Sequence, residues 1–243
     1  MRIPRIYTSQ TLREHSLLSL EPEPARHLQQ VLRLRSEAPL CLFDGSGRDF
    51  AATLHTADKT GVLVSVQGAG PPEPRPPLRI RLLLGISKGE RMDYALQKAV
   101  ELGVEELLPL FTEHTVVKLD QPRMARRMEH WQKVVVGACE QSGRSRLPTL
   151  EPPRHLDWQL EHETEGLRLV LDAEGSQRLV DCAPPGPRVT LLVGPEGGLD
   201  ARELEKACAA GFASVRLGPR ILRTETAPLA AIAAMQALWG DFR

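Results

Sequence analysis

Apolar positions follow two different patterns along this chain, and the pattern changes close to residue 77. Before that point, short apolar runs such as Leu40–Phe43 and Val62–Val66 lie between turn signals, of which Asp44–Gly47 is the clearest. After it, almost wholly apolar runs alternate with segments in which apolar residues recur at helical spacing. Short runs between turns are typical of β structure, whereas apolar runs between amphipathic helices are typical of a parallel sheet.

The first part, residues 1–72, is therefore predicted to be a small β-barrel with one helix. That helix is expected over Glu23–Leu34, with the apolar side chains of Leu28, Val31 and Leu32 on one side. A barrel of about 70 residues lies close to the lower limit of independent stability.

The second part, residues 73–243, is predicted to be an α/β domain whose parallel sheet is covered by helices on both faces. The boundary falls in the proline-rich stretch 68–77; proline fixes φ and lacks an N–H donor, so this stretch suits a semi-rigid linker. Strands are expected in the segments LRIRLLLGIS, EELLPLF, LRLVLDAEG, RVTLLVGPEGG and SVRLG, and helices near residues 89–103, 122–143, 200–211 and 226–240.

Composition narrows the classes of function. The 31 Lys and Arg residues balance the 31 Asp and Glu residues, so a nucleic-acid partner would require basic groups that are gathered locally. Aromatic residues make up 4% of the chain, which argues against platforms that stack bases. The four cysteines are far apart and have no partners at metal-ligand spacing, so we expect free thiols and no metal.

Neither a signal peptide nor a membrane span is expected. The N-terminal residues carry charge throughout, and the longest apolar run, Leu229–Trp239, is too short to cross a bilayer. We therefore expect a soluble, cytoplasmic protein.

Three strand ends of the second part carry the candidate chemistry, because ligands bind at the carboxyl ends of parallel strands. Besides LVLDAEG, where Asp172 and Glu174 leave the strand, two of them are loops. One is Gly194–Gly198, with the sequence GPEGG, and the other is Arg223–Thr226, with the sequence RTET. Glycine permits positive φ and a close approach of backbone amides to a ligand, although GPEGG alone also suits a plain tight turn. The patterns GxxxxGK[ST] and GxGxxG are absent, which disfavours ATPases, GTPases and Rossmann dehydrogenases.

Taken together, the segments LLVGPEGGLDARELE and VRLGPRILRTETAPLAA resemble the signature of the SPOUT methyltransferases. Further stretches, among them KGERMDYALQKAVELGV and WQKVVVGACEQSGR, extend the resemblance nearly end to end to the family that methylates N3 of a uridine in bacterial 16S ribosomal RNA. The resemblance implies a C-terminal trefoil knot, a PUA-like first domain, a homodimer, and S-adenosylmethionine as cofactor. It also implies the small ribosomal subunit as partner, with neither a membrane nor a metal involved.

The resemblance also implies which residues form the site. Arg223 is expected to stabilise the charge that develops as N3 loses its proton, and Glu225 to act as the base or to orient Arg223. The simpler alternatives are core packing for the leucines of the site and an ion pair between Arg223 and Glu225 that only caps a helix. The cofactor is expected to contact Leu171, Gly194, Pro195, Glu196, Gly197, Gly198, Leu217, Gly218, Ile221, Leu222, Thr224, Thr226 and Ala227, with Leu217, Ile221 and Leu222 as the wall against adenine.

Arginine residues are the expected contacts to RNA phosphates, which position a substrate without reading its sequence. The stretch 118–146 carries seven Lys or Arg residues against three acids, although a solvated helix face is an equally simple interpretation of it. The expected RNA-binding residues are Arg2, Arg5, Arg33, Arg35 and Arg144.

Two other functions remain open at this point. Other SPOUT enzymes methylate a different uridine or a ribose 2′-hydroxyl, although the full-length resemblance weighs against such a target. A catalytically silent RNA-binding factor is the alternative outside enzymes, and both loops are intact here, which weighs against it. A hydrolase is disfavoured because the sequence offers no candidate Ser-His-Asp triad.

Overall fold

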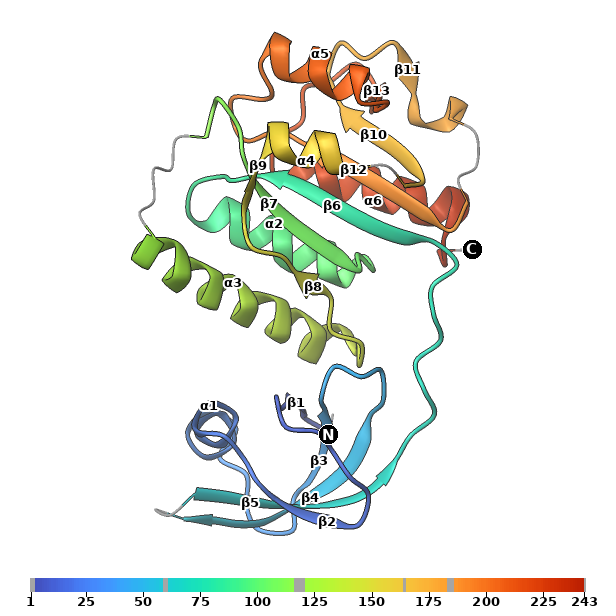
Figure 1. The fold of residues 1–243 in the computed structure, drawn as a ribbon. Helices are drawn as coiled ribbons and strands as arrows, with labels where there is room; N and C mark the ends of the chain where they lie inside the picture. Colours follow the sequence, from blue (N-terminus) through green and yellow to red (C-terminus); the bar gives the residue numbers. More distant parts are fainter. Residues whose placement is uncertain (1–2, 59–60, 116–120, 164, 183–185, 243) are drawn as a thin grey trace. The chain divides into compact units, whose positions relative to one another are not determined.

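The computed structural model divides the chain into two compact units (Figure 1). One unit is formed by Met1–Pro74 together with Cys139–Leu147, and the other by Arg75–Ala138 together with Pro148–Arg243. The predicted boundary between residues 72 and 73 had placed the short segment 139–147 with the second part. The structure describes residues 3–58, 61–115, 121–163, 165–182 and 186–242.

The first unit is built on a five-stranded sheet with the order β1-β3-β4-β5-β2, in which only the pair β1–β3 is parallel. Inward-facing side chains such as Leu42, Leu54 and Val64 are fully buried, so the predicted β-rich core is confirmed. No pair among the described residues joins β1 to β2. The strands are β1 Arg5–Tyr7, β2 Ser16–Ser19, β3 Pro39–Phe43, β4 Phe50–Asp58 and β5 Gly61–Ala69.

The predicted helix 23–34 is shorter and less regular than expected. An α-helical turn, α1 (Pro22–Arg26), continues as a π-helical turn, η1 (His27–Val31), in which the Leu32 N–H bonds to the His27 carbonyl. The wider π turn rotates the following residues around the axis. Leu28 is therefore buried as predicted, whereas Val31 is 66% exposed and Leu32 36% exposed, so that part of the prediction was wrong.

Hydrogen bonds to Glu73 and Glu140 explain why the segment 139–147 belongs to the first unit. The Glu73 carboxylate accepts hydrogen bonds from the backbone N–H groups of Ser145 and Arg146, at 2.7 and 2.6 Å. The Glu140 carboxylate accepts one from the Tyr7 N–H at 3.0 Å. Each bond satisfies a backbone donor with a charged acceptor, which makes the segment an integral part of this unit.

The second unit contains an eight-stranded sheet in which every pair is parallel, as the apolar runs predicted. Its order is β11-β13-β10-β12-β6-β7-β8, with β9 pairing onto β7. The strands are β6 Arg79–Gly85, β7 Glu106–Phe111, β8 Thr149–Leu150, β9 Arg154–His155, β10 Leu167–Leu171, β11 Gln177–Arg178, β12 Arg188–Val193 and β13 Ala213–Arg216.

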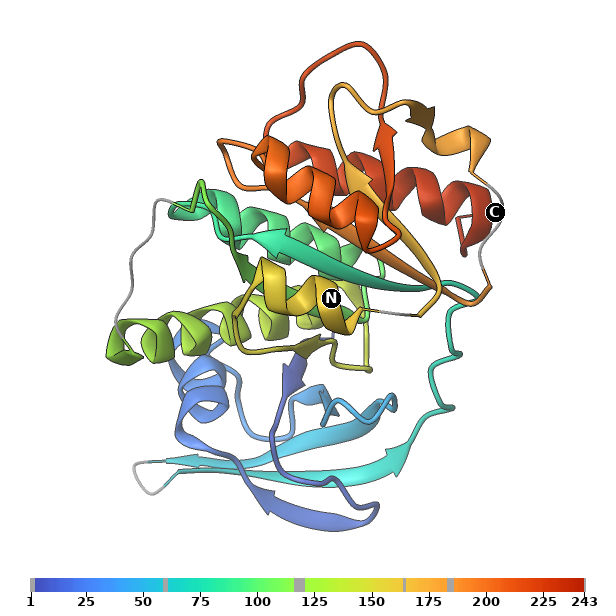
Figure 2. The same cartoon turned by 45° about the horizontal axis from the view of Figure 1, so that its top comes forward.

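Helices cover both faces of this sheet. The helices α4 and α5 pack together on one face, and α2 and α6 pack together on the other (Figures 1 and 2). A capping box between Asp200 and Glu203 begins α5 where the sequence predicted it. The helices are α2 Glu90–Glu101, α3 Gln121–Ser142, α4 Leu156–His162, α5 Ala201–Ala209 and α6 Thr226–Trp239, with a 3₁₀ turn, η2, at Leu179–Asp181.

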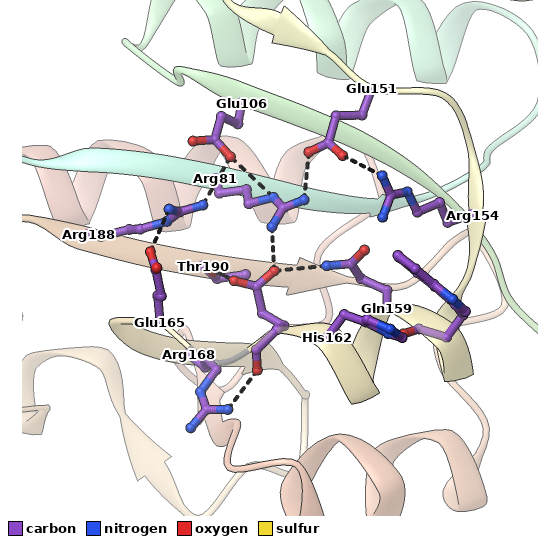
Figure 3. A network of polar contacts seen from close by, with 12 residues as sticks. Arg81, Glu106, Glu151, Arg154, Gln159, His162, Glu165, Arg168, Arg188 and Thr190 are labelled. Carbon is purple, nitrogen blue, oxygen red and sulfur yellow. Dashed lines mark hydrogen bonds and ion pairs between the residues drawn. The ribbon is translucent and has the colours of Figure 1, made fainter.

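A network of charged side chains lies toward the amino ends of the strands (Figure 3). Arg81 of β6 forms ion pairs with Glu106, Glu151 and Glu163 at 3.3, 2.5 and 2.6 Å. Glu163 is almost fully buried and accepts a further hydrogen bond from Thr190. The stretch 148–166 supplies β8, β9 and α4 and several members of this network.

None of the helices in the described parts of the chain has the length and apolar character needed to cross a membrane.

Candidate active site

A pocket of about 650 Å³ lies where the adjacent strands β13, β10 and β12 end at their carboxyl termini. Three segments form most of its wall: 171–173, 193–199 and 215–225, the last without Arg216 and Pro219. Arg91 and Ala227 complete it. Parallel strands bring their carboxyl ends to one edge of a sheet, so residues far apart in sequence meet here. The charged network of Figure 3 lies toward the other ends of the same strands.

The GPEGG loop that follows β12 folds tightly on itself. The Gly198 N–H donates to the Pro195 carbonyl at 2.9 Å, and Gly198 has a φ of +71°. A Cβ atom at Gly194 would lie 2.7 Å from the carbonyl carbon of Gly198, which is closer than any real Cβ contact. Glycine at both ends of the loop is thus required by its shape.

Glu196 turns its carboxylate toward the start of α2. It accepts a hydrogen bond from the Lys88 N–H at 2.9 Å and pairs with the Arg91 guanidinium at 3.3 Å. Burial by itself would raise the pKa of Glu196, but the Lys88 N–H and Arg91 outweigh it, and the pKa is lowered. Glu196 therefore stays charged and holds Arg91 at the wall of the pocket.

His114 lies against the outer side of the GPEGG loop. A Cβ atom at Gly197 would stand 2.9 Å from the His114 Cβ, and the His114 Nδ1 lies 3.2 Å from the Gly198 carbonyl oxygen. A side chain at Gly197 would consequently collide with His114 before it reached the pocket.

The second loop, residues 217–225, is fastened to the first by Thr224. The Thr224 hydroxyl donates to the Gly194 carbonyl at 3.0 Å and lies 3.3 Å from the Ser87 hydroxyl. The Arg223 carbonyl accepts the N–H groups of Thr226 and Ala227, which fixes the turn that begins α6.

Arg223 and Glu225 both line the pocket, but no ion pair joins them in the described structure. Among the described residues neither side chain has an ion-pair partner, and the Glu225 carboxylate makes no side-chain cap to α6. The Glu225 Oε2 is buried without a hydrogen-bond donor in the described structure. The simple alternative, a capping ion pair between these two residues, is therefore absent here.

The structure brings nearly all of the predicted site residues to this pocket. Thr226 is the exception; it lies one position inside α6 and is not part of the wall. Ile221 belongs to the wall, and its side chain is 88% exposed. Asp172, which leaves a predicted strand end, is also part of the wall. The wall further contains residues that we did not predict: Arg91, Ala173, Val193, Leu199 and Val215.

Among the missed residues, Arg91 had no local signal, because it lies about 100 residues before the GPEGG loop and reaches the pocket only through the fold. Arg220 also lines the pocket, and it lies within the stretch 217–227 over which the family resemblance implies contacts to the cofactor.

The predicted RNA-binding arginines differ in their surroundings. Arg33 and Arg35 are exposed, and Arg33 has a φ of +49°. Arg5 is largely buried, forms an ion pair with Asp49 and donates to the Arg144 carbonyl, which leaves little of its guanidinium for a phosphate. Arg2 lies outside the described residues.

No group of three or more His, Cys, Asp or Glu side chains in the described structure is arranged to hold a metal ion.

Comparison with known proteins relates the chain to others at the level of sequence and structure. The family model described as an RNA methyltransferase domain matches residues 74–236, and the model described as an RNA methyltransferase PUA domain matches residues 20–67. The Ribosomal RNA small subunit methyltransferase E of Buchnera aphidicola is 32% identical over 241 residues, which cover 99% of this chain and 98% of the relative.

Two solved structures match over their full lengths. A protein of Legionella pneumophila, described as a methyltransferase in complex with the cofactor SAM, is 39% identical with a TM-score of 0.96, and each chain is covered completely. A Ribosomal RNA small subunit methyltransferase E of Neisseria gonorrhoeae, bound to S-adenosyl methionine, is also 39% identical, with a TM-score of 0.92 and complete coverage of both chains.

Proposed function

The chain belongs to the RNA methyltransferase family, and from that membership we propose that it transfers the methyl group of S-adenosylmethionine to N3 of a uridine in 16S ribosomal RNA. The relatives named as small-subunit methyltransferases support the substrate, and the two cofactor-bound structures support the donor. One observation carries the proposal: Thr224 joins two loops around a pocket whose wall contains Arg223 and Glu225.

The pocket suits S-adenosylmethionine in size and in chemistry. A volume of about 650 Å³ is typical of pockets for small molecules. Gly198 and Gly218 both have positive φ, and no atom lies within 4 Å of the place where a Cβ would stand, so each presents bare backbone to a ligand. When bound, the cofactor supplies an electrophilic methyl group. The residues proposed to hold it are Leu171, Gly194 to Gly198, Leu217, Gly218, Leu222, Thr224 and Ala227.

Arg223 is proposed to stabilise the charge on the substrate. Uridine N3 carries a proton and becomes a nucleophile only when that proton leaves, and the negative charge then spreads onto O2 and O4. The Arg223 side chain has no ion-pair partner among the described residues, so its guanidinium is available to that charge. Arg223 also precedes the N-terminus of α6, where the helix dipole adds positive potential.

Glu225 is proposed to take the proton from N3. A carboxylate oxygen that is buried without a donor is a strong acceptor, and the Glu225 Oε2 is in that position beside the pocket. The other role that we considered, orienting Arg223, is less well supported, because no hydrogen bond or ion pair joins the two side chains in the described structure.

Positioning of the RNA is proposed for the first unit, with the domain boundary near residue 72. Arg33, Arg35 and Arg144 are the arginines proposed to meet phosphates, and the match to an RNA methyltransferase PUA domain over residues 20–67 supports an RNA-binding role. Arg144 is half-buried, and its carbonyl oxygen is held by Arg5.

A trefoil knot, a homodimer and a cytoplasmic location complete the proposal. The helix α6 contacts α2 and also η2, which belongs to the connection between β10 and β12, and this closeness of the C-terminal helix to that connection supports a knot. The exposed side chains of Leu238 and Phe242, at and beyond the end of α6, are apolar and would suit a contact between two copies.

Nucleoside analysis of ribosomal RNA tests the proposed function. Small ribosomal subunits from cells that lack this protein are incubated with the purified protein and S-adenosylmethionine, and the RNA is digested and analysed by mass spectrometry. We expect 3-methyluridine to appear at one position of 16S RNA. A methyl group on a ribose hydroxyl, on another base, or on no nucleoside at all would overturn the proposal.

A further inference from the structure

Ile221 is the most exposed large apolar side chain in the described structure. Its exposed fraction is 88%, whereas the next most exposed, Val31, reaches 66%. Single exposed apolar residues are common on protein surfaces, but this one stands at the wall of the pocket proposed to be catalytic. Its position therefore calls for a functional explanation.

Two arginines flank Ile221 at the same wall. Arg220 and Arg223 both line the pocket, both are exposed, and neither has an ion-pair partner among the described residues. The arginines of the network in Figure 3 are different, because Arg81 and Arg188 are each paired with at least two carboxylates. The rim of the pocket thus combines one apolar side chain with two cations that have not been neutralised.

The shape of the loop keeps Ile221 away from the core. Gly218 has a φ of +108°, and no atom lies within 4 Å of its would-be Cβ, so the loop leaves β13 without close packing. At the other end of the loop, the Thr224 hydroxyl donates a hydrogen bond to the Gly194 carbonyl. Ile221 lies on the span between these two points, fixed at one end and projecting into solvent.

We propose that Ile221 packs against the target nucleotide of the RNA substrate, entering beside the base while Arg220 meets a neighbouring phosphate. This inference rests on the proposed function and extends it to a residue that recognises the substrate. Arg223 keeps its proposed role at the edge of the base. In this arrangement Arg220 contacts a phosphate, Ile221 the face of the base and Arg223 its edge.

The chemistry of the reaction requires such a contact. Uridine N3 lies on the base-pairing edge, so an enzyme that modifies it must act on a base removed from its stack and its pair. Apolar side chains that enter between bases are a known means of holding nucleic acid in an unstacked form. The two flanking cations favour a polyanion over a second copy of this chain, whose net charge is zero.

The variant Ile221→Ala tests this assignment against the control Val180→Ala. Val180 is also a strongly exposed apolar residue, at 62%, but it lies in η2 and outside the pocket wall. Methyl transfer is measured on small ribosomal subunits from cells that lack the protein, and cofactor affinity is measured by calorimetry. We expect kcat/KM for the subunits to fall by about 10- to 100-fold in Ile221→Ala, the loss associated with one large buried side chain.

Several outcomes separate this role from others. Cofactor affinity should stay within about twofold of the parent, Val180→Ala should match the parent, and Ile221→Met, which restores an apolar side chain, should recover most of the lost transfer. A parallel loss of cofactor affinity would make Ile221 part of the cofactor site instead. Dissociation of an oligomer in sedimentation would assign it to a contact between copies, and either result overturns the inference.

The parent protein separates failure of this inference from failure of the proposed function. If the parent protein transfers no methyl group, both the proposed function and the role of Ile221 are overturned. If the parent is active and Ile221→Ala is equally active, only the role of Ile221 is overturned.

Discussion

The Thr224 hydroxyl donates a hydrogen bond of 3.0 Å to the carbonyl oxygen of Gly194. These residues are 30 positions apart, and their contact joins the loop after β12 to the loop after β13. Both loops line the same pocket, so one side chain sets the distance between the two halves of its wall. The proposed cofactor site therefore depends on a hydrogen bond that replacing the threonine hydroxyl by a methyl group would remove.

That exchange gives the first prediction. Thr224→Val keeps the shape of the side chain but leaves the Gly194 carbonyl without its donor, a loss of about 1–2 kcal/mol. We expect the dissociation constant of S-adenosylmethionine to rise by about 5- to 30-fold in calorimetry. Thr224→Ser retains the hydroxyl and should bind almost as tightly as the parent. Equal affinity in the valine and serine variants would mean that the bond does not shape the pocket.

A second prediction concerns the contact between Gly197 and His114. Because a Cβ at Gly197 would meet His114 at 2.9 Å, Gly197→Ala should displace the GPEGG loop and weaken cofactor binding. Glycine at position 114 removes the Cβ atom that causes the clash, so the double variant Gly197→Ala/His114→Gly should bind the cofactor more tightly than Gly197→Ala alone. Strictly additive effects of the two substitutions would show that a side chain at position 197 does not collide with His114.

Stability at acid pH should depend on Glu21. Burial alone would raise its pKa, but hydrogen bonds from Ser9 and Thr8 outweigh it and lower the pKa from 4.5 to about 2. A pKa that is lower in the folded state contributes stability above pH 4.5, and this stability is lost as the pH falls toward 2. In urea unfolding, Glu21→Gln should therefore be less stable than the parent at pH 7 and should approach it near pH 2.

The control for that measurement is Glu205→Gln on the exposed surface of α5. Its unfolding curve should follow that of the parent at every pH. If Glu21→Gln showed the same deficit at pH 2 as at pH 7, its effect would not come from the charge.

The charged network of Figure 3 should be the most sensitive part of the second unit to loss of a single charge (Figure 3). Arg81→Met removes the cation from three carboxylates, of which Glu163 is nearly fully buried, and leaves that charge uncompensated. We expect a loss of about 3–5 kcal/mol in the free energy of unfolding, measured with denaturant. Arg178→Met breaks an exposed pair with Asp181 and should cause no measurable change. Similar effects in the two variants would contradict a structural role for the network.

Much of the second unit could be predicted from the sequence because its signals are local. Apolar runs identify the parallel strands, and the capping residues of α5 mark its start to the residue. The loops of the site could be found in the same way, because glycine in Gly194 to Gly198 and the polar residues around Thr224 mark loops at the ends of apolar strands. The resemblance to a known family added the cofactor and the assignment of roles, which no periodicity contains.

What could not be predicted depends on contacts between distant residues. Arg91 reaches the pocket because Glu196 holds it, and the sequence carries no mark of that pair. The segment 139–147 looked like the end of a long helix, yet Glu73 and Glu140 tie it to the first unit. Ile221 was predicted to be a wall of the pocket on its apolar character alone, whereas its exposure depends on the conformation of the whole loop.

Turnover of the variant Arg223→Ala is the most direct test of the proposed chemistry. Arg223 is proposed to stabilise charge that appears only as uridine N3 loses its proton, and such an interaction affects the rate more than binding. We expect the methylation rate to fall by about two to three orders of magnitude while cofactor affinity changes little, with partial recovery as rising pH ionises the uridine. Arg223→Lys keeps the charge but loses the planar guanidinium, so its methylation rate should lie between those of the parent and of Arg223→Ala. Turnover at the parent rate in Arg223→Ala, or a loss explained entirely by weaker cofactor binding, would contradict the account.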